Sequence, residues 1–391
     1  MAPFAVAGTM TRLLTMDEIE AHLTMADCLA ALERMFEELG HGRAITDSRE
    51  DVLTPVPSPA EDAVPPVYHG LKSMGGSIPA LGVGAIRINS DVIHWPYRDD
   101  ARVREKLPLA PGGRYTGLVL LFSTDTGEPL AIFPDGVVQS FRVGGTSALG
   151  AKVLARDDAR TLGLLGAGWQ ARAHLLAHDA CQSLDRVRVY APTPASREAF
   201  VDEMADRVDP DLEAVDTPEA AVRDADILQS VTNSLAPVFE LDWLEPGMHV
   251  GVIHDREAPA GLFDPSAYDA FVQSWSTVVQ FEERGNQLVE REIPTKNVNN
   301  YVVEAAEPVP RFSDRSTTRE PLCDWSLVPG LGDVMVDDSL GRTTDDGITV
   351  FYNRGMGVQF AAVGKALFDV AEREGLGHDI PTELLTQTYH P

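Results

Sequence analysis

The spacing of hydrophobic side chains predicts three long helices. Between residues 17 and 40 apolar positions recur at helical intervals, so we expect one helix with Asp17 as its N-terminal cap and Gly40 at its end. The same spacing returns at 140–156 and at 355–375, where glycines follow the last apolar turn. Each helix has an apolar face and is therefore expected to pack against a core.

Shorter apolar runs predict strands between the first two helices. Residues 83–88 form one run, and 117–122 and 129–133 form two more. The turn sequence at 125–127 joins the last two into a predicted hairpin. The stretch 91–115 is rich in charge and proline and predicts a long loop, a feature that often accompanies a binding site.

Strands and helices alternate from residue 161 to residue 233. This alternation predicts βαβ units around a parallel sheet and places the chain in the α/β class. With 391 residues the chain exceeds what one hydrophobic core usually supports, so we expect two domains.

A glycine-rich turn lies at the start of this alternating region. The apolar run 162–165 is followed by a helical pattern, and the turn between them is Gly166, Ala167, Gly168, Trp169, Gln170 and Ala171. The first glycine permits a sharp turn, the second leaves room for a diphosphate, and the final alanine lets helix and strand pack closely. The N–H groups of the helix start then bind the diphosphate. The motif predicts a Rossmann domain that binds NAD or NADP.

The end of the next strand, at 187–190, bears on which dinucleotide binds. An acidic residue there usually binds the ribose 2′-hydroxyl of NAD, but none follows this strand. Thr193, Ser196 and Arg197 could instead hold the 2′-phosphate of NADP. We therefore expect NADP(H) to be preferred over NAD(H), the alternative being that Arg197 is merely an exposed helix residue.

The polar end of a further strand, at 224–233, predicts a second contact with the cofactor. Ligands of open parallel sheets bind at the carboxyl ends of the strands. Val231, Thr232 and Asn233 are therefore expected to flank the nicotinamide ribose, unless they form an ordinary turn.

The charge balance argues against several classes of partner. The formal net charge is −28, from 60 acidic against 32 basic side chains, and such a surface repels nucleic acid and anionic membranes. No apolar run could span a bilayer and the N-terminus lacks the features of a signal peptide, so we expect a cytoplasmic protein. Cys28, Cys181 and Cys323 show no metal-ligand spacing, and we expect no metal. Few lysines and many acids suggest a salt-adapted host, which full folding and activity without molar salt would contradict.

Several stretches together resemble the ornithine cyclodeaminase/μ-crystallin family. Residues 120–131 resemble its "LFD-x-x-TG-x-PLA" pattern, 141–148 its "RTAA-x-SA" helix start, 242–250 its "W-L-x-PG-x-H" and 341–351 its "GRT-x-x-x-x-ITVF". The resemblance spans roughly residues 80–360 in order, and it is specific as a set.

This resemblance implies a second domain and a reaction. It implies a Rossmann domain at 143–345 and an α+β substrate-binding and dimerisation domain built from 1–142 and 346–391, in a homodimer. Members either cyclise ornithine with loss of ammonia or reduce imines of 2-oxo acids with NAD(P)H. Both reactions exchange a hydride at the amino-acid α-carbon, with the nicotinamide supplying the chemistry.

The same resemblance points to residues that bind and activate the substrate. Arg142, in the "RTAA"-like segment, is expected to bind the substrate carboxylate, or else to be a surface arginine at a helix start. Arg49 lies near the family's first carboxylate-binding arginine, or is a solvated loop charge. Arg87 stands where relatives have a lysine. It can bind a carboxylate or polarise a carbonyl, but it is a poor proton shuttle. Lys72 could then supply the proton, unless it is simply exposed.

The position of the family's catalytic aspartate is ambiguous in this chain. An ungapped alignment selects Arg256, a shift of one residue selects Asp255, and aligning the following proline selects Glu257. We favour Asp255 for its residue type, and His254 beside it suits proton transfer near neutral pH. The alternative is a loop of solvated charges.

Three functions follow from these observations. The leading hypothesis is an NAD(P)-dependent oxidoreductase acting on a C–N bond of a small amino acid or its imine, as an amino-acid dehydrogenase or ketimine reductase. The second is a lyase of the cyclodeaminase type, which recycles its cofactor and releases ammonia. The third is a non-catalytic NADP-binding protein, since a fold alone does not fix a function.

Overall fold

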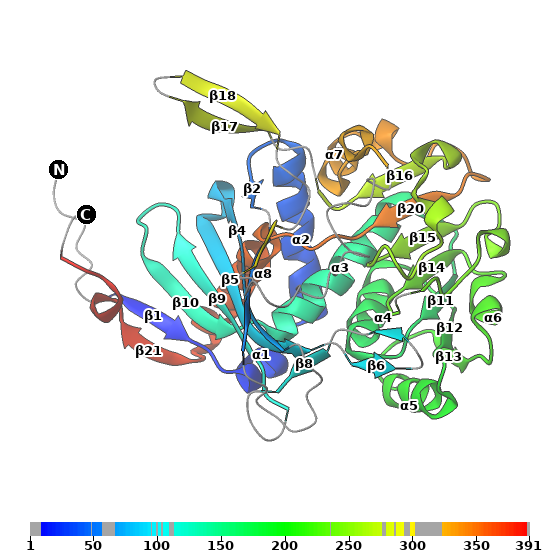
Figure 1. Ribbon diagram of the computed structural model, residues 1–391, viewed down its shortest axis with the longest axis horizontal. Helices are drawn as coiled ribbons and strands as arrows, with labels where there is room; N and C mark the ends of the chain where they lie inside the picture. Colours follow the sequence, from blue (N-terminus) through cyan, green and yellow to red (C-terminus); the bar gives the residue numbers. More distant parts are fainter. Residues whose placement is uncertain are drawn as a thin grey trace.

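The computed structural model describes residues 9–47, 49–56, 67–94, 96–98, 101–102, 105–108, 113–234, 236–275, 279–284, 287–292, 298–301 and 323–388. They form two lobes, each built on its own sheet, with helices packed between the sheets (Figure 1).

The first lobe is a mixed sheet of ten strands. Its order is β19 (Val298–Tyr301), β3 (Glu50–Pro55), β4 (Tyr68–Ile78), β5 (Val83–His94), β9 (Thr116–Ser123), β10 (Pro129–Pro134), β1 (Met10–Leu13) and β21 (His378–Pro381), with β2 (Ile45–Thr46) on β4 and β8 (Glu105–Leu107) on β5. The antiparallel pairing of β9 with β10 confirms the hairpin.

The stretch 91–115 is not the continuous loop that we expected. Its first residues, 91–94, continue β5, because the backbone there still pairs with β4. The chain then forms the short strands β6 (Tyr97–Arg98) and β7 (Ala101–Arg102) before β8 returns to pair with β5. Beyond the sheet, β17 (Val279–Arg284) and β18 (Gln287–Glu292) form a separate hairpin that projects from the body (Figure 1).

The second lobe is a parallel sheet of seven strands. Its order is β13 (Asp211–Ala214), β12 (Arg186–Tyr190), β11 (Thr161–Leu165), β14 (Ile227–Ser230), β15 (His249–Val252), β20 (Thr349–Tyr352) and β16 (Ala270–Gln273). The helices α4 (Trp169–Cys181), α5 (Pro194–Met204) and α6 (Pro218–Val222) connect its first four strands. This order, with the first strand central and the direction of travel reversing after the third, is that of a Rossmann domain.

Strand β20 extends this sheet past residue 345, where we expected the Rossmann domain to end. It pairs with β15 on one side and β16 on the other, and its apolar side chains are buried on both faces of the sheet. The chain therefore leaves the parallel sheet only after residue 352 and enters the final helix a few residues later.

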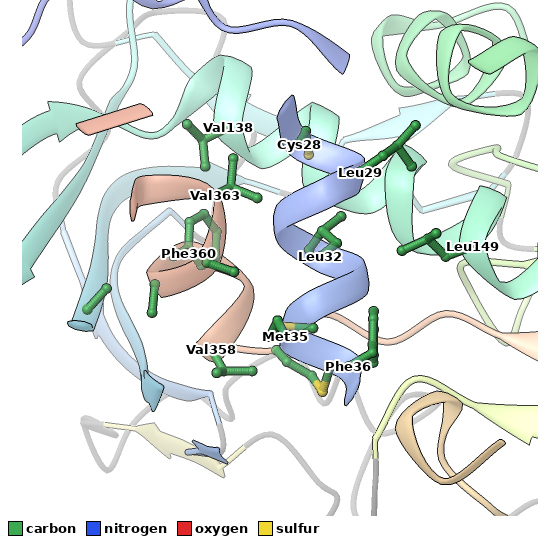
Figure 2. Close-up of a cluster of buried hydrophobic side chains, with 14 of the residues drawn as sticks. Cys28, Leu29, Leu32, Met35, Phe36, Val138, Leu149, Val358, Phe360 and Val363 are labelled. Carbon is green, nitrogen blue, oxygen red and sulfur yellow. The ribbon is translucent and has the colours of Figure 1, made fainter. Parts of the chain in front are cut away.

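Helices α2 (Met25–Gly40), α3 (Gly136–Leu154) and α8 (Val358–Glu374) form the core between the sheets. Helix α8 lies on β4, β5 and β9, α2 packs on α8 and on α7 (Leu331–Val336), and α3 contacts α8 as well as β15 and β20. Figure 2 shows the apolar side chains that these helices bring together, among them Leu32, Met35, Phe36, Leu149, Phe360 and Val363. Within the described ranges no helix has both the length and the apolar character needed to cross a bilayer.

The single helix expected at 17–40 is two helices. Helix α1 (Met16–His22) ends before Thr24, whose backbone is extended, and α2 then begins. Thr15 and Thr24 cap these helices, not Asp17, and each forms a capping box with an acidic residue three positions later. Hydrophobic spacing did not reveal this break, because the apolar faces of the two helices follow one another almost without interruption.

Candidate active site

The glycine-rich turn joins β11 to α4 at the carboxyl edge of the parallel sheet. Gly166 has a φ of 120°, and a Cβ there would lie 2.4 Å from the carbonyl oxygen of Val231, so only glycine fits. A Cβ on Gly168 would meet no atom within 4 Å, and no side chain caps the first turn of α4. The turn therefore offers open space beside free helix N–H groups, which fits the diphosphate of a dinucleotide.

The rest of the motif shapes this turn. Ala171 is fully buried, whereas Trp169 is exposed at the start of α4, and Ala167 and Gln170 are half-buried. Arg172, which sequence reasoning missed, donates from Nη1 to the carbonyl oxygens of Ala167 (3.1 Å) and Gly168 (3.0 Å). Its position in the first turn of α4 was the available signal, but an arginine on a helix surface is usually solvated.

Arg197 lies near the start of α5, the helix that follows β12, and is not the exposed residue of the alternative interpretation. It is buried, donates from Nη1 to the carbonyl oxygen of Ala191 at 3.2 Å, and pairs through Nη2 with Asp216 from the end of β13. Thr193 and Ser196 are exposed beside it. The three candidate 2′-phosphate ligands therefore lie together at the start of α5, just beyond the carboxyl end of β12.

Glu257 ties together the loops that follow β14 and β15. It is fully buried, and one carboxylate oxygen accepts from Thr232 N (2.7 Å) and Oγ1 (3.0 Å). The other accepts from Ile253 N (3.0 Å) and His254 N (3.1 Å). Burial raises the pKa of this carboxyl. Because both oxygens are occupied inside the protein, Glu257 holds the edge of the sheet and is not available to a substrate.

Asp255 is the accessible carboxylate of the three residues that the alignments selected. Its side chain is 35% exposed, and its Oδ1 lies 3.7 Å from Nδ1 of His254. Because β15 and β20 are adjacent, Asp255 lies at the same edge of the sheet as Arg354. Burial lowers the pKa of Arg354, and the negative charge of Asp255 opposes part of this effect. On the other side of β15, the end of β14 presents a buried Val231, a half-buried Thr232 and an exposed Asn233.

Arg142 lies in the interior of α3, not at a helix start on the surface. Helix α3 begins at Gly136, so Arg142 is carried into the space between the lobes and is only 4% exposed. Its guanidinium donates to Oε1 of Gln359 and of Gln139, both at 2.8 Å, and its Nε has no hydrogen-bond partner among the described residues. Burial, and then the field of Arg87, lower its pKa to about 9.

Arg142 also touches the carboxyl edge of the parallel sheet. A Cβ on Gly355, just after β20, would lie 2.5 Å from Nη1 of Arg142. This contact places a buried cation, held by two neutral amides, beside the segment that follows β20, the strand next to β15, whose end leads to Asp255. An anion is the natural partner for such a cation, because a buried charge without one is costly.

Arg87 reaches the same place from the mixed sheet. Its Nε donates to Asp135, the residue before α3, at 2.6 Å, and Nη1 lies 3.9 Å from the sulfur of Met74. The guanidinium groups of Arg87 and Arg142 both lie over the ring of Phe360, at 5.3 and 5.1 Å from its centroid. Phe360 belongs to the core cluster in Figure 2, so α8 supplies a rigid platform for both cations.

Arg49 and Lys72 complete the cationic cluster. Arg49 is 30% exposed and makes a bidentate ion pair with Asp51, and its charge is among the causes that lower the pKa of Arg142. Lys72 is buried, not exposed, and its Nζ lies 2.5 Å from Asp91. The structure therefore brings Arg49, Arg87, Arg142 and Lys72 to one region between the lobes. Among the described residues, no group of three or more His, Cys, Asp or Glu could hold a metal ion.

Comparisons with known proteins show which sequences this chain resembles. The model of the ornithine cyclodeaminase/mu-crystallin family matches residues 110–375. A Δ1-pyrroline-2-carboxylate reductase of Bacillus cereus is 24% identical over 380 residues, covering 96% of this chain and 98% of that protein.

Two solved structures share the fold. Thermococcus litoralis Δ1-pyrroline-2-carboxylate reductase, in complex with NADH and L-proline, has a TM-score of 0.69 at 20% identity, over 95% of this chain and all of that one. An archaeal alanine dehydrogenase dimer with bound NAD has a TM-score of 0.67 at 23% identity, over 95% and 99% of the two chains.

Proposed function

This chain belongs to the ornithine cyclodeaminase/mu-crystallin family and, like the relatives it matches, is an enzyme; on that premise we propose that it reduces the imine of a small 2-oxo acid with NAD(P)H. The observation that carries the proposal is Arg142, a buried cation that makes no ion pair among the described residues, at the edge of the sheet where the glycine-rich turn would hold a dinucleotide. The cofactor supplies the hydride, and the protein supplies position and charge.

The side chains divide the remaining work between the two lobes. Arg142, with Arg49 at the entrance, binds the α-carboxylate and fixes the α-carbon. Asp255, with its half-exposed carboxylate on the opposite side, orients the nitrogen of the imine or a water. Lys72, in its ion pair with Asp91, is a candidate proton donor. Reduction adds one hydride to the carbon and one proton to the nitrogen, leaving the amino acid and oxidised cofactor.

Nicotinamide absorbance tests this function against its alternatives. With ammonium, a 2-oxo acid and NADPH, an imine reductase consumes one cofactor for each amino acid formed. A cyclodeaminase, given ornithine and oxidised cofactor, releases ammonia with no net change in absorbance. Saturable cofactor binding with neither reaction would support a non-catalytic binding protein and contradict the proposal.

We also propose that NADP(H) is the preferred cofactor. No acid occurs in residues 191–197 after β12. Arg197 pairs with Asp216, whose side chain is 93% exposed, so a 2′-phosphate can replace this carboxylate as its partner.

Replacing Arg197 with methionine should weaken NADPH binding roughly 10- to 100-fold, the value of one charge-assisted contact. NADH binding should change little. The matched control is Arg186→Met, at the amino end of β12. Calorimetry with both dinucleotides decides, and tighter binding of NADH by the wild type would contradict the preference.

We propose further that two copies pair through the outer face of the mixed sheet. Apolar side chains alternate outward along β3, β4 and β9, and Val52, Leu71 and Leu118 are each about two-fifths exposed. Leu71 lies opposite Val52, and Leu118 opposite Ile88, so two apolar pairs lie on the same sheet, separated by the pairing of Leu71 with Ser90. The mass in solution by light scattering tests this pairing.

A further inference from the structure

The cationic cluster holds more positive charge than one carboxylate requires. Its four cations are Arg49, Arg87, Arg142 and Lys72, and at its margin the more exposed Lys106 adds a fifth, with its Nζ 2.9 Å from Asp91. The carboxylates paired with them in the described part of this region are Asp51, Asp91 and Asp135. The excess of cations over acids persists in a protein whose overall charge is −28, so it is a local feature that needs a local explanation.

The excess of positive charge is concentrated at Arg87 and Arg142. Their guanidinium groups lie over one aromatic ring, within 5.3 Å of its centroid, and the charge of Arg87 is among the causes that lower the pKa of Arg142, after burial, so two like charges interact in a mostly buried site. Like charges at this range repel, and the repulsion is relieved when an anion lies between or against both. A ligand with two carboxylates would give Arg142 an anionic partner and give Arg87 a second one beside Asp135.

Arg87 retains the atoms needed for this role. Asp135 occupies its Nε, and Nη1 has only the weak sulfur contact with Met74. Its side chain remains 11% exposed, so the guanidinium is not sealed into the core. A guanidinium held by its Nε can present its outer N–H groups to a carboxylate, a geometry that lysine does not reproduce.

The acids of the cluster also disfavour a cationic substrate side chain. Asp51, Asp91 and Asp135 each already pair with at least one basic side chain. A substrate ammonium group entering this region would meet Arg87 without an unpaired carboxylate from these three. The charge pattern therefore selects against diamino acids while it favours a second negative charge.

We propose that the substrate is an amino dicarboxylic acid or its imine, whose α-carboxylate binds Arg142 and whose side-chain carboxylate binds Arg87. This inference rests on the proposed imine reduction and specifies the substrate class of that same site. Arg87 is thus the residue that sets specificity, whereas Arg142 serves any amino-acid substrate.

Chain-matched substrates provide the test. Initial rates are measured with NADPH and ammonium for oxaloacetate against 2-oxobutanoate and for 2-oxoglutarate against 2-oxopentanoate, in wild type, Arg87→Met and Arg87→Lys. We expect kcat/KM of the wild type to favour the dicarboxylic acid of each pair. In Arg87→Met we expect kcat/KM for the dicarboxylic acids to fall about 100-fold, mainly through KM, and for the neutral acids to change less than about threefold. Arg87→Lys should fall between.

Two further variants separate binding from folding. Arg87→Met leaves Asp135 without its arginine, so Arg87→Met/Asp135→Asn removes both charges, and its thermal unfolding and NADPH affinity report on the fold. Arg34→Met removes an exposed arginine from α2 and should have no effect. Preference for the neutral acids, or equal losses for both classes in Arg87→Met, would overturn the inference while imine reduction stands. Normal NADPH binding without reduction of any 2-oxo acid would overturn imine reduction and this inference with it.

Discussion

Replacing Arg142 with methionine is expected to lower kcat/KM for the imine by roughly 100- to 10,000-fold while the protein stays folded. The loss corresponds to two charge-assisted hydrogen bonds to the carboxylate, each worth about 1.5–3 kcal/mol. Stability should change little, because a shorter apolar side chain replaces a buried cation that makes no ion pair among the described residues. Steady-state kinetics and thermal unfolding measure the two effects.

Lys152→Met is the matched control for this variant. Lys152 lies on the same helix, α3, and pairs with Glu33 at the surface, so its removal subtracts the same charge without touching the site. We expect its activity and unfolding temperature to match those of the wild type. If Arg142→Met kept full activity, or lost activity only because it unfolded, Arg142 would not be the carboxylate ligand.

Two glycine substitutions should separate the fold of the glycine-rich turn from its binding of the diphosphate. In Gly166→Ala the new Cβ is forced against the Val231 carbonyl in a backbone conformation that alanine rarely adopts. We expect a loss of about 2–4 kcal/mol of stability, together with loss of dinucleotide binding, because the ends of β11 and β14 must separate.

Gly168→Ala is the paired variant, and its expected result differs. Its Cβ meets no protein atom, so unfolding should stay within about 0.5 kcal/mol of the wild type. The methyl group would occupy the space assigned to the diphosphate, so we expect NADPH affinity to fall by at least about tenfold. Unchanged affinity in Gly168→Ala would place the diphosphate elsewhere.

The parallel sheet could be predicted from the sequence because its signals are local. The apolar run before Gly166, the turn and the helix after it lie within a few residues, and the alternation of strand and helix continues to β14. The position of β20 could not be predicted, because its insertion between β15 and β16 depends on contacts across some hundred residues of chain. The break between α1 and α2 depends on two threonine caps that hydrophobic spacing does not register.

The sequence identified residues of the candidate site but not how they are arranged. Arg49, Arg87, Arg142 and Lys72 were all identified from the sequence. Arg142 is buried because α3 begins at Gly136, and Lys72 pairs with Asp91 because its strand, β4, lies beside β5. Neither the helix start nor the strand pairing could be deduced from the sequence. The alignment left Glu257 and Asp255 as alternatives, and only the burial of Glu257 beneath four donors distinguishes them.

The strand order has a consequence for how the protein is made. Strands β15 and β16 both pair with β20, which is synthesised after them. Strand β1, near the start of the chain, pairs on its outer side with β21, near the end. During synthesis neither sheet can therefore be completed before the ribosome has released almost the whole polypeptide. Until then the nascent chain carries open strand edges, which are prone to pair with other chains. The two lobes must mature together, and a polypeptide truncated before residue 349 would complete neither.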